Sequence, residues 1–107
     1  MKKIKTADLV IDLEHQTVLK EGKIIPVKKS EYIVLLKLVC NPNQVLLVDS
    51  LMAELENHYL RDFSLVTLRA HIYRLRSQLG TYQGRNYIET KVSFGYLWKY
   101  SSVFCKK

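Results

Sequence analysis

The chain of 107 residues carries a formal net charge of +7, with 48% hydrophobic and 25% charged side chains. This size and composition are typical of one soluble globular domain. A membrane span is not expected, because no apolar run approaches about 18 residues. A signal peptide is not expected either, because the basic start lacks a sustained apolar segment.

The charge is distributed unevenly along the chain. Residues 1–60 hold eight lysines and eight acidic residues, whereas residues 61–107 hold nine basic residues and only two acids, Asp62 and Glu89. No carboxylate occurs between Phe63 and Ile88. A basic half of this kind indicates a polyanionic partner, and a solvated basic face that only aids solubility is the alternative.

Residues 1–28 predict an antiparallel sheet of three or four short strands. Apolar and polar residues alternate in "LVIDL", "TVLK" and "KIIPV", and Gly22 in "EGK" suits a hairpin turn. From residue 29 to residue 80 the period becomes helical, which predicts three helices. The expected buried residues of the first helix are Tyr32, Leu35, Leu36, Val39 and Cys40. The second helix is expected over about residues 49–57, with Leu51, Met52 and Leu55 buried.

The third helix combines an apolar stripe with a basic face. Its expected buried residues, spaced three and four apart, are Leu65, Leu68, Ile72, Leu75 and Leu79. Ser64 is the expected N-cap and Gly80 the expected end. The opposite face and its margins hold Val66, Thr67, Arg69, Ala70, His71, Tyr73, Arg74, Arg76 and Ser77. An α-helix fits the major groove of DNA, where arginine binds guanine and small methyl groups meet thymine. Arg74 and Arg76 have an alternative, structural role, because basic residues near the C-terminal end of a helix interact favourably with its dipole. This alternative does not explain Arg69.

The C-terminal part predicts a hairpin over residues 81–100, followed by a tail over residues 101–107. The segment "NYIETKVSFGYLWKY" is rich in strand-forming residues, with Gly95 placed at a bend. Strands, three helices of which the third is basic, and a hairpin are the element order of a winged helix. We therefore expect one domain over residues 1–107, an α+β winged helix-turn-helix whose hairpin is the wing.

Chemical sites other than a basic surface have little support. His15, His58 and His71 are scattered, and no group of residues has metal-ligand spacing or forms a phosphate loop. The sequence predicts no enzyme, metal, cofactor or small-molecule substrate. Cys40 is expected to be a small buried residue and Cys105 a free thiol, which indicates a reducing, cytoplasmic compartment.

The segments "LRAHIYRLRSQLG" and "YIETKVSFGYLW" together resemble the OmpR/PhoB-type effector domain of bacterial two-component response regulators. The N-terminal segment "DLVIDLEHQTVLKEGKIIPVKKSEYIVLLKLVCNPNQVL" is similar to the sheet and first helix of that family. The resemblance implies sequence-specific binding of double-stranded DNA by a transcription regulator. It places the third helix in the major groove and the wing near the minor groove, and implies a tandem pair on direct repeats and an upstream receiver domain.

The resemblance also assigns roles to individual residues. Arg74 is the expected base-reading residue, Thr67 contacts a phosphate or a base edge, and His71 and Arg76 lie at or near the DNA backbone. Hydroxyl contacts to phosphate are expected from Tyr73 and Thr90. The outward face and flank of the predicted helix, and not the resemblance, add Arg69, Ala70 and Ser77 as candidate DNA contacts. Lys91 is a further candidate, because Lys91 and Lys99 can replace part of the wing's charge.

Several positions depart from the family pattern, and they bear on the function. Val66 and Val92 stand where many members have arginine, at the start of the third helix and in the wing. Leu97 replaces a basic residue, Arg69 replaces an aspartate, and Lys28 replaces the threonine that caps the first helix. These changes leave open a winged helix that binds an acidic protein instead of DNA.

The loop before the third helix has two interpretations. By resemblance, the residues around 59–63 (Tyr59, Leu60, Arg61 and Phe63) contact RNA polymerase, whereas packing of Leu60 and Phe63 in the core is the structural alternative. The sequence leaves open the operator, the regulated genes and the sign of the effect. It also leaves open whether the chain is a fragment, a stand-alone protein or part of a membrane-anchored regulator.

Overall fold

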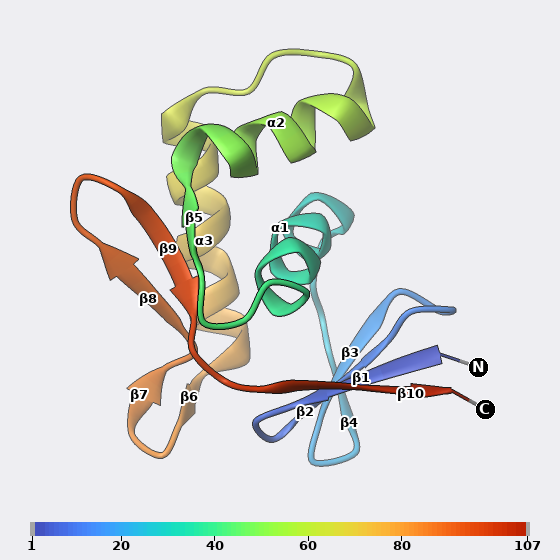
Figure 1. Cartoon of the computed structure of the whole chain (residues 1–107). Coiled ribbons are helices and arrows are strands. Elements are labelled where there is room, and N and C mark those ends of the chain that lie inside the picture. The colour runs from blue at the N-terminus through green and yellow to red at the C-terminus, as the bar shows by residue number, and fades with distance from the viewer. Residues whose placement is uncertain (1, 107) are drawn as a thin grey trace.

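The computed structural model describes residues 2–106, which form three helices and two main antiparallel sheets (Figure 1). The larger sheet has the order β10-β1-β2-β3-β4. Its strands are β1 (Lys2–Thr6), β2 (Leu9–Asp12), β3 (Thr17–Lys20), β4 (Lys23–Ile25) and β10 (Ser102–Lys106). Ile4, Leu9, Ile11 and Val18 alternate with more exposed residues and are buried, which confirms the predicted N-terminal sheet.

The three helices are α1 (Lys29–Val39), α2 (Val48–Tyr59) and α3 (Leu65–Leu79). They pack against one another, and α2 lies farthest from the larger sheet (Figure 1). The smaller sheet, of order β5-β9-β8, joins β5 (Val45–Leu47) to the wing strands β9 (Gly95–Trp98) and β8 (Ile88–Lys91). A short hairpin of β6 (Thr81–Tyr82) and β7 (Arg85–Asn86) precedes them. No helix in residues 2–106 has the length and apolar character needed to cross a bilayer.

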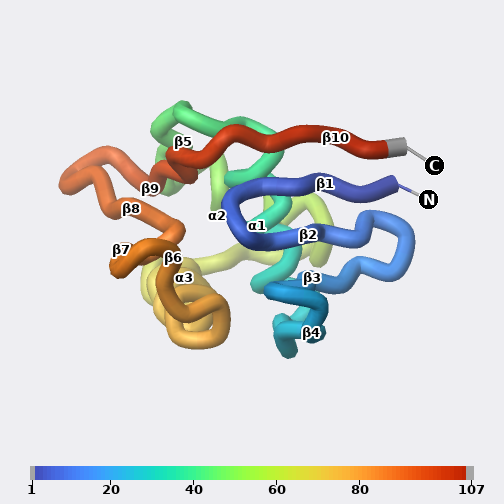
Figure 2. Tube along the Cα trace, turned by 90° about the horizontal axis from the view of Figure 1, so that it is seen from below, coloured from blue at the N-terminus to red at the C-terminus, as the bar shows by residue number. Residues whose placement is uncertain are grey.

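Strand β10 corrects the prediction of a tail over residues 101–107. Residues 102–106 pair antiparallel with β1, from Ser102 opposite Thr6 to Lys106 opposite Lys2. The two strands run side by side, and their outer ends lie next to each other (Figure 2). Cys105 is a free, partly buried thiol in this strand. The backbone groups of β1 therefore have hydrogen-bonding neighbours on both sides.

The buried side of α1 is wider than the predicted stripe. Besides Tyr32, Leu35 and Val39, the helix buries Ile33, Val34 and Leu38 and the carboxylate of Glu31. The prediction that Cys40 is buried is wrong, because α1 ends at Val39 and Cys40 is an exposed C-cap. Leu36 is only half-buried. A helix that packs against a sheet on one side and two helices on another needs more than one apolar row.

A cluster of aromatic side chains joins the wing to the N-terminal sheet. Trp98 is fully buried, stacks on Tyr87 with ring centroids 5.5 Å apart, and donates from Nε1 to Thr6 Oγ1 at 2.8 Å. Strand β5, which the sequence analysis did not predict, adds a third strand, with Leu46 opposite Tyr96. The wing is therefore held by covered, paired strands at its base.

Candidate nucleic-acid interface

Helix α3 begins as its sequence predicts. The Ser64 hydroxyl accepts a hydrogen bond from the Thr67 backbone N–H at 3.1 Å, which satisfies one unpaired group of the first turn. Leu68, Ile72, Leu75 and Leu79 are buried, as expected. Leu65 departs from the predicted stripe, because it is 36% exposed at the open end of the helix, and His71 takes an inward place instead.

The outer face of α3 is accessible and contains no acidic residue. Val66 and Tyr73 are each 74% exposed, Arg69 and Ser77 are exposed, and Thr67 and Ala70 are partly exposed. Arg69 forms no ion pair within residues 2–106. A cationic side chain surrounded by small, apolar and hydroxyl groups is suited to an anionic surface that also presents base edges.

Arg74 has a structural partner that the sequence analysis missed. Its Nε donates to Glu31 Oε2 at 2.5 Å, and the Glu31 side chain is fully buried. The other carboxylate oxygen, Oε1, accepts the backbone N–H of Lys28 at 3.2 Å. Lys28 itself provides no side-chain cap. Because 41% of the Arg74 side chain stays exposed, this arginine joins a buried carboxylate to the outer face of α3.

His71 lies in the core, so the structure does not support the predicted contact with the DNA backbone. Its side chain is 5% exposed and packs edge-on against Phe63, with centroids 6.5 Å apart. Arg74 Nη2 lies 3.2 Å from His71 Nδ1, and His71 Nε2 is buried without a hydrogen-bond partner among the described residues. Burial, aided by the Arg74 charge, lowers the pKa of His71.

Arg76 is also occupied within the fold. Its Nε and Nη2 donate to the Ile88 carbonyl at 3.2 and 2.7 Å, and Nη2 also donates to Thr90 Oγ1 at 2.8 Å. The end of α3 is thereby tied to strand β8. Arg76 and Thr90, both predicted DNA contacts, set the position of the wing relative to the helix.

The wing has less free charge than its lysines suggest. Glu89 forms ion pairs with Lys91 at 2.9 Å and Lys99 at 2.8 Å. Hydrogen bonds from Lys99 and Lys91 lower the pKa of Glu89 to about 2. The tip beyond these pairs is apolar, since Val92 is 80% and Phe94 65% exposed.

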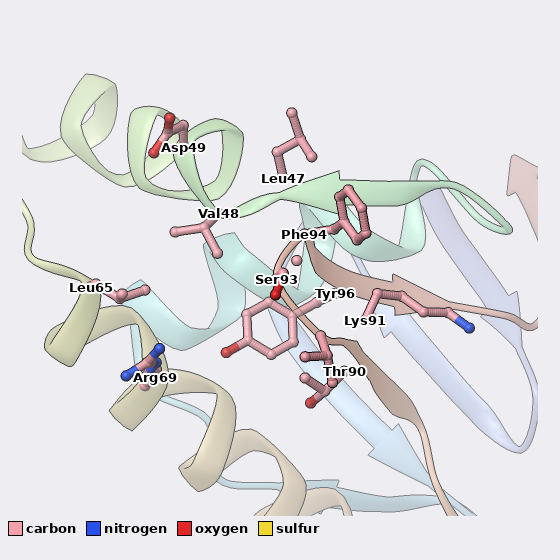
Figure 3. A pocket seen from close by; sticks show the side chains of 12 residues that line it. Leu47, Val48, Asp49, Leu65, Arg69, Thr90, Lys91, Ser93, Phe94 and Tyr96 are labelled. Carbon is pink, nitrogen blue, oxygen red and sulfur yellow. The ribbon is translucent and has the colours of Figure 1, made fainter.

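A groove of about 560 Å³ separates α3 from the wing tip (Figure 3). Leu65 and Arg69 line it from α3, and Leu47, Val48 and Asp49 line it from β5 and the start of α2. The wing contributes the residues from Thr90 to Tyr96. The groove thus places Arg69 and the wing tip on one continuous surface.

The loop before α3 combines both interpretations of its sequence. Phe63 is buried in the core, as the structural alternative predicts, and its backbone N–H donates to Glu56 Oε2 at 3.0 Å. Leu60 is 89% exposed, with φ of 54°, so its predicted packing in the core is wrong. The described residues contain no group of three or more side chains that could hold a metal ion.

These features define a class: a winged-helix domain with a basic, acid-free third helix beside an exposed hairpin. The family described as transcriptional regulatory protein, C terminal, matches residues 22–98. The chain belongs to this family of DNA-binding effector domains, the OmpR/PhoB type found in response regulators of transcription.

Relatives and solved structures agree with this assignment. The response regulator protein GraR of Staphylococcus epidermidis is 34% identical over 92 residues, which cover 84% of this chain and 40% of the relative. The chain thus spans about 40% of the length of the curated relatives it matches. The Thermotoga maritima response regulator DrrB, an OmpR/PhoB homologue, has a TM-score of 0.73 at 29% identity over 86% of this chain and 42% of that one. The Klebsiella pneumoniae RstA DNA-binding domain in complex with its RstA box has the same fold, with a TM-score of 0.74 at 24% identity over 91% and 96% of the two chains.

Proposed function

We propose that this chain binds double-stranded DNA sequence-specifically, with α3 in the major groove and the β8–β9 wing near the adjacent minor groove. The supporting observation is the outer face of α3, which is exposed, basic and free of carboxylates from Val66 to Ser77. Glu31 is buried against Arg74 and Glu89 is paired with two lysines, so these two carboxylates do not offset the charge, and Asp49 lies across the groove from Arg69 without an ion pair to it.

Arg69 becomes the principal base-reading residue of this proposal. It is exposed and unpaired within the described part of the chain, whereas Arg74 is partly engaged by Glu31. A free guanidinium can bind guanine O6 and N7 bidentately, and the methyl groups of Ala70 and Val66 can meet a thymine methyl. The exposed part of Arg74 supplies a second contact.

The hydroxyl groups at the edges of the face suit the DNA backbone. Thr67, Tyr73, Ser77 and Thr90 are exposed or partly exposed around Arg69 and the wing base. Hydroxyl and cationic contacts to phosphate position a protein without reading sequence. Lys91 adds charge beside them once its pairing with Glu89 is shared with a phosphate.

The assembly on DNA is part of the proposal. A single module of this kind buries roughly 600–1,000 Å² of protein surface, which is at the low end for specific complexes. Binding as a tandem pair on direct repeats doubles that interface. We propose that the remaining length, which the relatives have and this chain does not span, includes a receiver domain that controls pairing. The exposed Leu60 and Arg61 are the proposed contact for RNA polymerase.

The test is a selection from a randomised duplex pool, followed by binding measurements over a salt series. The affinity for the selected site should fall with salt by about 0.9 log units per log unit for each phosphate neutralised. Arg69→Ala should weaken binding to the selected site more than to random DNA, and Arg69→Lys should recover the salt slope but not the base preference. Lys23→Ala, an exposed charge removed from β4, is the control and should leave binding unchanged.

The alternative function, a module that binds an acidic protein, gives the opposite pattern. Such a module would select no sequence from the pool, and Arg69→Ala would not discriminate between duplexes. The apolar wing tip is the observation that favours this alternative, because exposed Val92 and Phe94 are also suited to a protein contact.

A further inference from the structure

The tip of the wing consists of two exposed apolar side chains. Val92 is 80% exposed and Phe94 is 65% exposed, on either side of Ser93. The basic residue next to them, Lys91, is bound to Glu89 at 2.9 Å. The tip is thus unsuited to reading the negative potential of a narrow minor groove, which requires an inserted basic side chain.

The backbone of the tip is held by hydrogen bonds, although its side chains are exposed. The Phe94 backbone N–H donates to the Lys91 carbonyl at 2.9 Å and closes the turn, and Val48 N–H donates to the Phe94 carbonyl at 3.3 Å. Gly95 lies so close to β5 that an added Cβ would stand 1.9 Å from the Leu46 carbonyl oxygen. An apolar pair held in this way loses little conformational freedom when a partner covers it.

The position of the tip relative to α3 indicates the partner. Val92, Phe94 and Arg69 line the same groove of about 560 Å³, and Figure 3 shows Phe94 and Arg69 on opposite sides of it. A duplex whose major groove receives α3 would present its next minor groove to Val92 and Phe94. Minor-groove proteins insert apolar side chains between base pairs in this way and kink the duplex by about 20–90°.

We propose that Val92 and Phe94 form an apolar wedge, which enters the minor groove at one base step and bends the DNA. This inference rests on the proposed function and adds a specificity to it. Pyrimidine–purine steps such as TA unstack and kink most easily, so the wedge selects a flexible step at its position without a hydrogen bond to any base. The wing thus reads the deformability of DNA.

The experiment uses the selected duplex with 2-aminopurine at the step facing the wing and a fluorophore at each end. The wild-type chain should increase 2-aminopurine fluorescence, bring the duplex ends closer and prefer TA to a stiff AA step. The double variant Val92→Ser/Phe94→Ser should lose all three effects while its salt slope stays unchanged, because no phosphate contact is removed. Both positions are exposed, so thermal unfolding should match the wild type, and Ile24→Ser, 68% exposed on β4, is the control.

The outcomes separate the inference from the proposed function. Arg69→Ala should weaken binding, yet the complexes that form should remain bent. Specific binding by the double variant with unchanged bending and unchanged step preference would overturn the wedge and leave the proposed function intact. If the double variant no longer binds as a pair on a tandem site but still bends a single site, the tip contacts protein and not DNA. That result would also overturn the wedge. Failure of the wild type to bind any duplex would refute both.

Discussion

The main effect of Arg74→Ala should be a loss of fold stability, and its effect on DNA binding should be secondary. The substitution leaves the Glu31 carboxylate, which is fully buried, without the guanidinium that lies 2.5 Å from it. The remaining donor to that carboxylate is the Lys28 backbone N–H at 3.2 Å. A buried charge that loses its partner cannot recover its hydration, so the loss appears in the free energy of unfolding.

The size of the effect follows from the exposure of the pair. Removing one partner of a buried ion pair costs about 3–5 kcal/mol. The Arg74 side chain is 41% exposed, so water can approach the carboxylate in the variant, and we expect a loss near the lower end, about 3 kcal/mol. For a domain of about 100 residues this lowers the melting temperature by about 12 °C.

Thermal unfolding at pH 7, followed by circular dichroism, measures this change. Arg69→Ala is the matched control, because it removes an exposed arginine from the same helix and should stay within about 0.5 kcal/mol of the wild type. The double variant Glu31→Gln/Arg74→Ala should be more stable than Arg74→Ala alone, since a neutral amide replaces the isolated charge. Equal melting temperatures for Arg74→Ala and Arg69→Ala would refute the structural role of the pair.

Three further predictions concern charge, pH and backbone packing. Glu89→Gln should free both wing lysines, tighten DNA binding and steepen the salt slope by about 0.9 for each phosphate newly engaged; an unchanged slope in a salt titration would contradict this. The lowered pKa of His71 means that stability is complete above its unfolded value of about 6.5 and falls as the pH drops below that value. The melting temperature should therefore decrease from pH 7.5 to pH 5.5, and His71→Gln, unlike the exposed control His58→Gln, should reduce that decrease. Gly95→Ala should lower the free energy of unfolding by about 3 kcal/mol, because the added methyl group would overpack against β5. Gly22→Ala has open space around it but a φ of 79°, and should lower the free energy of unfolding by about 1–2 kcal/mol. A lower denaturant midpoint for Gly22→Ala than for Gly95→Ala would contradict the packing argument.

The parts of the fold that depend on local pattern were predictable. The apolar spacing from Leu68 to Leu79 located the buried side of α3, and Ser64 marked its start. Both signals lie within a few residues of the structure they specify. The exposed face of the helix followed from the same periodicity, because the residues that are not buried must lie on the other side.

The parts that depend on distant partners were not predictable. Strand β10 exists because β1 offers an edge about one hundred residues earlier, and β5 is too short for a periodic signal of its own. Glu31 and Arg74 are 43 positions apart, so the helix pattern placed Arg74 outward without showing what it binds. A single acid near the start of an apolar helix was the available hint. The ion pairs of Lys91 and Lys99 with Glu89 likewise depend on the folded wing, so the sequence alone does not reveal them.

The pairing of β1 with β10 also determines how the domain responds to a pulling force. Lys2 and Lys106 are direct partners at the outer end of an antiparallel pair, so a tension applied to both ends of the domain acts across the pair. The inter-strand hydrogen bonds are then loaded one after another, as in a zipper, instead of sharing the load in shear. Strand β10 would peel away at low force, while the three helices and the wing stay folded. The pairing of β1 with β10 is therefore the mechanically weakest part of the domain under this tension, and it lies away from the surface proposed for DNA.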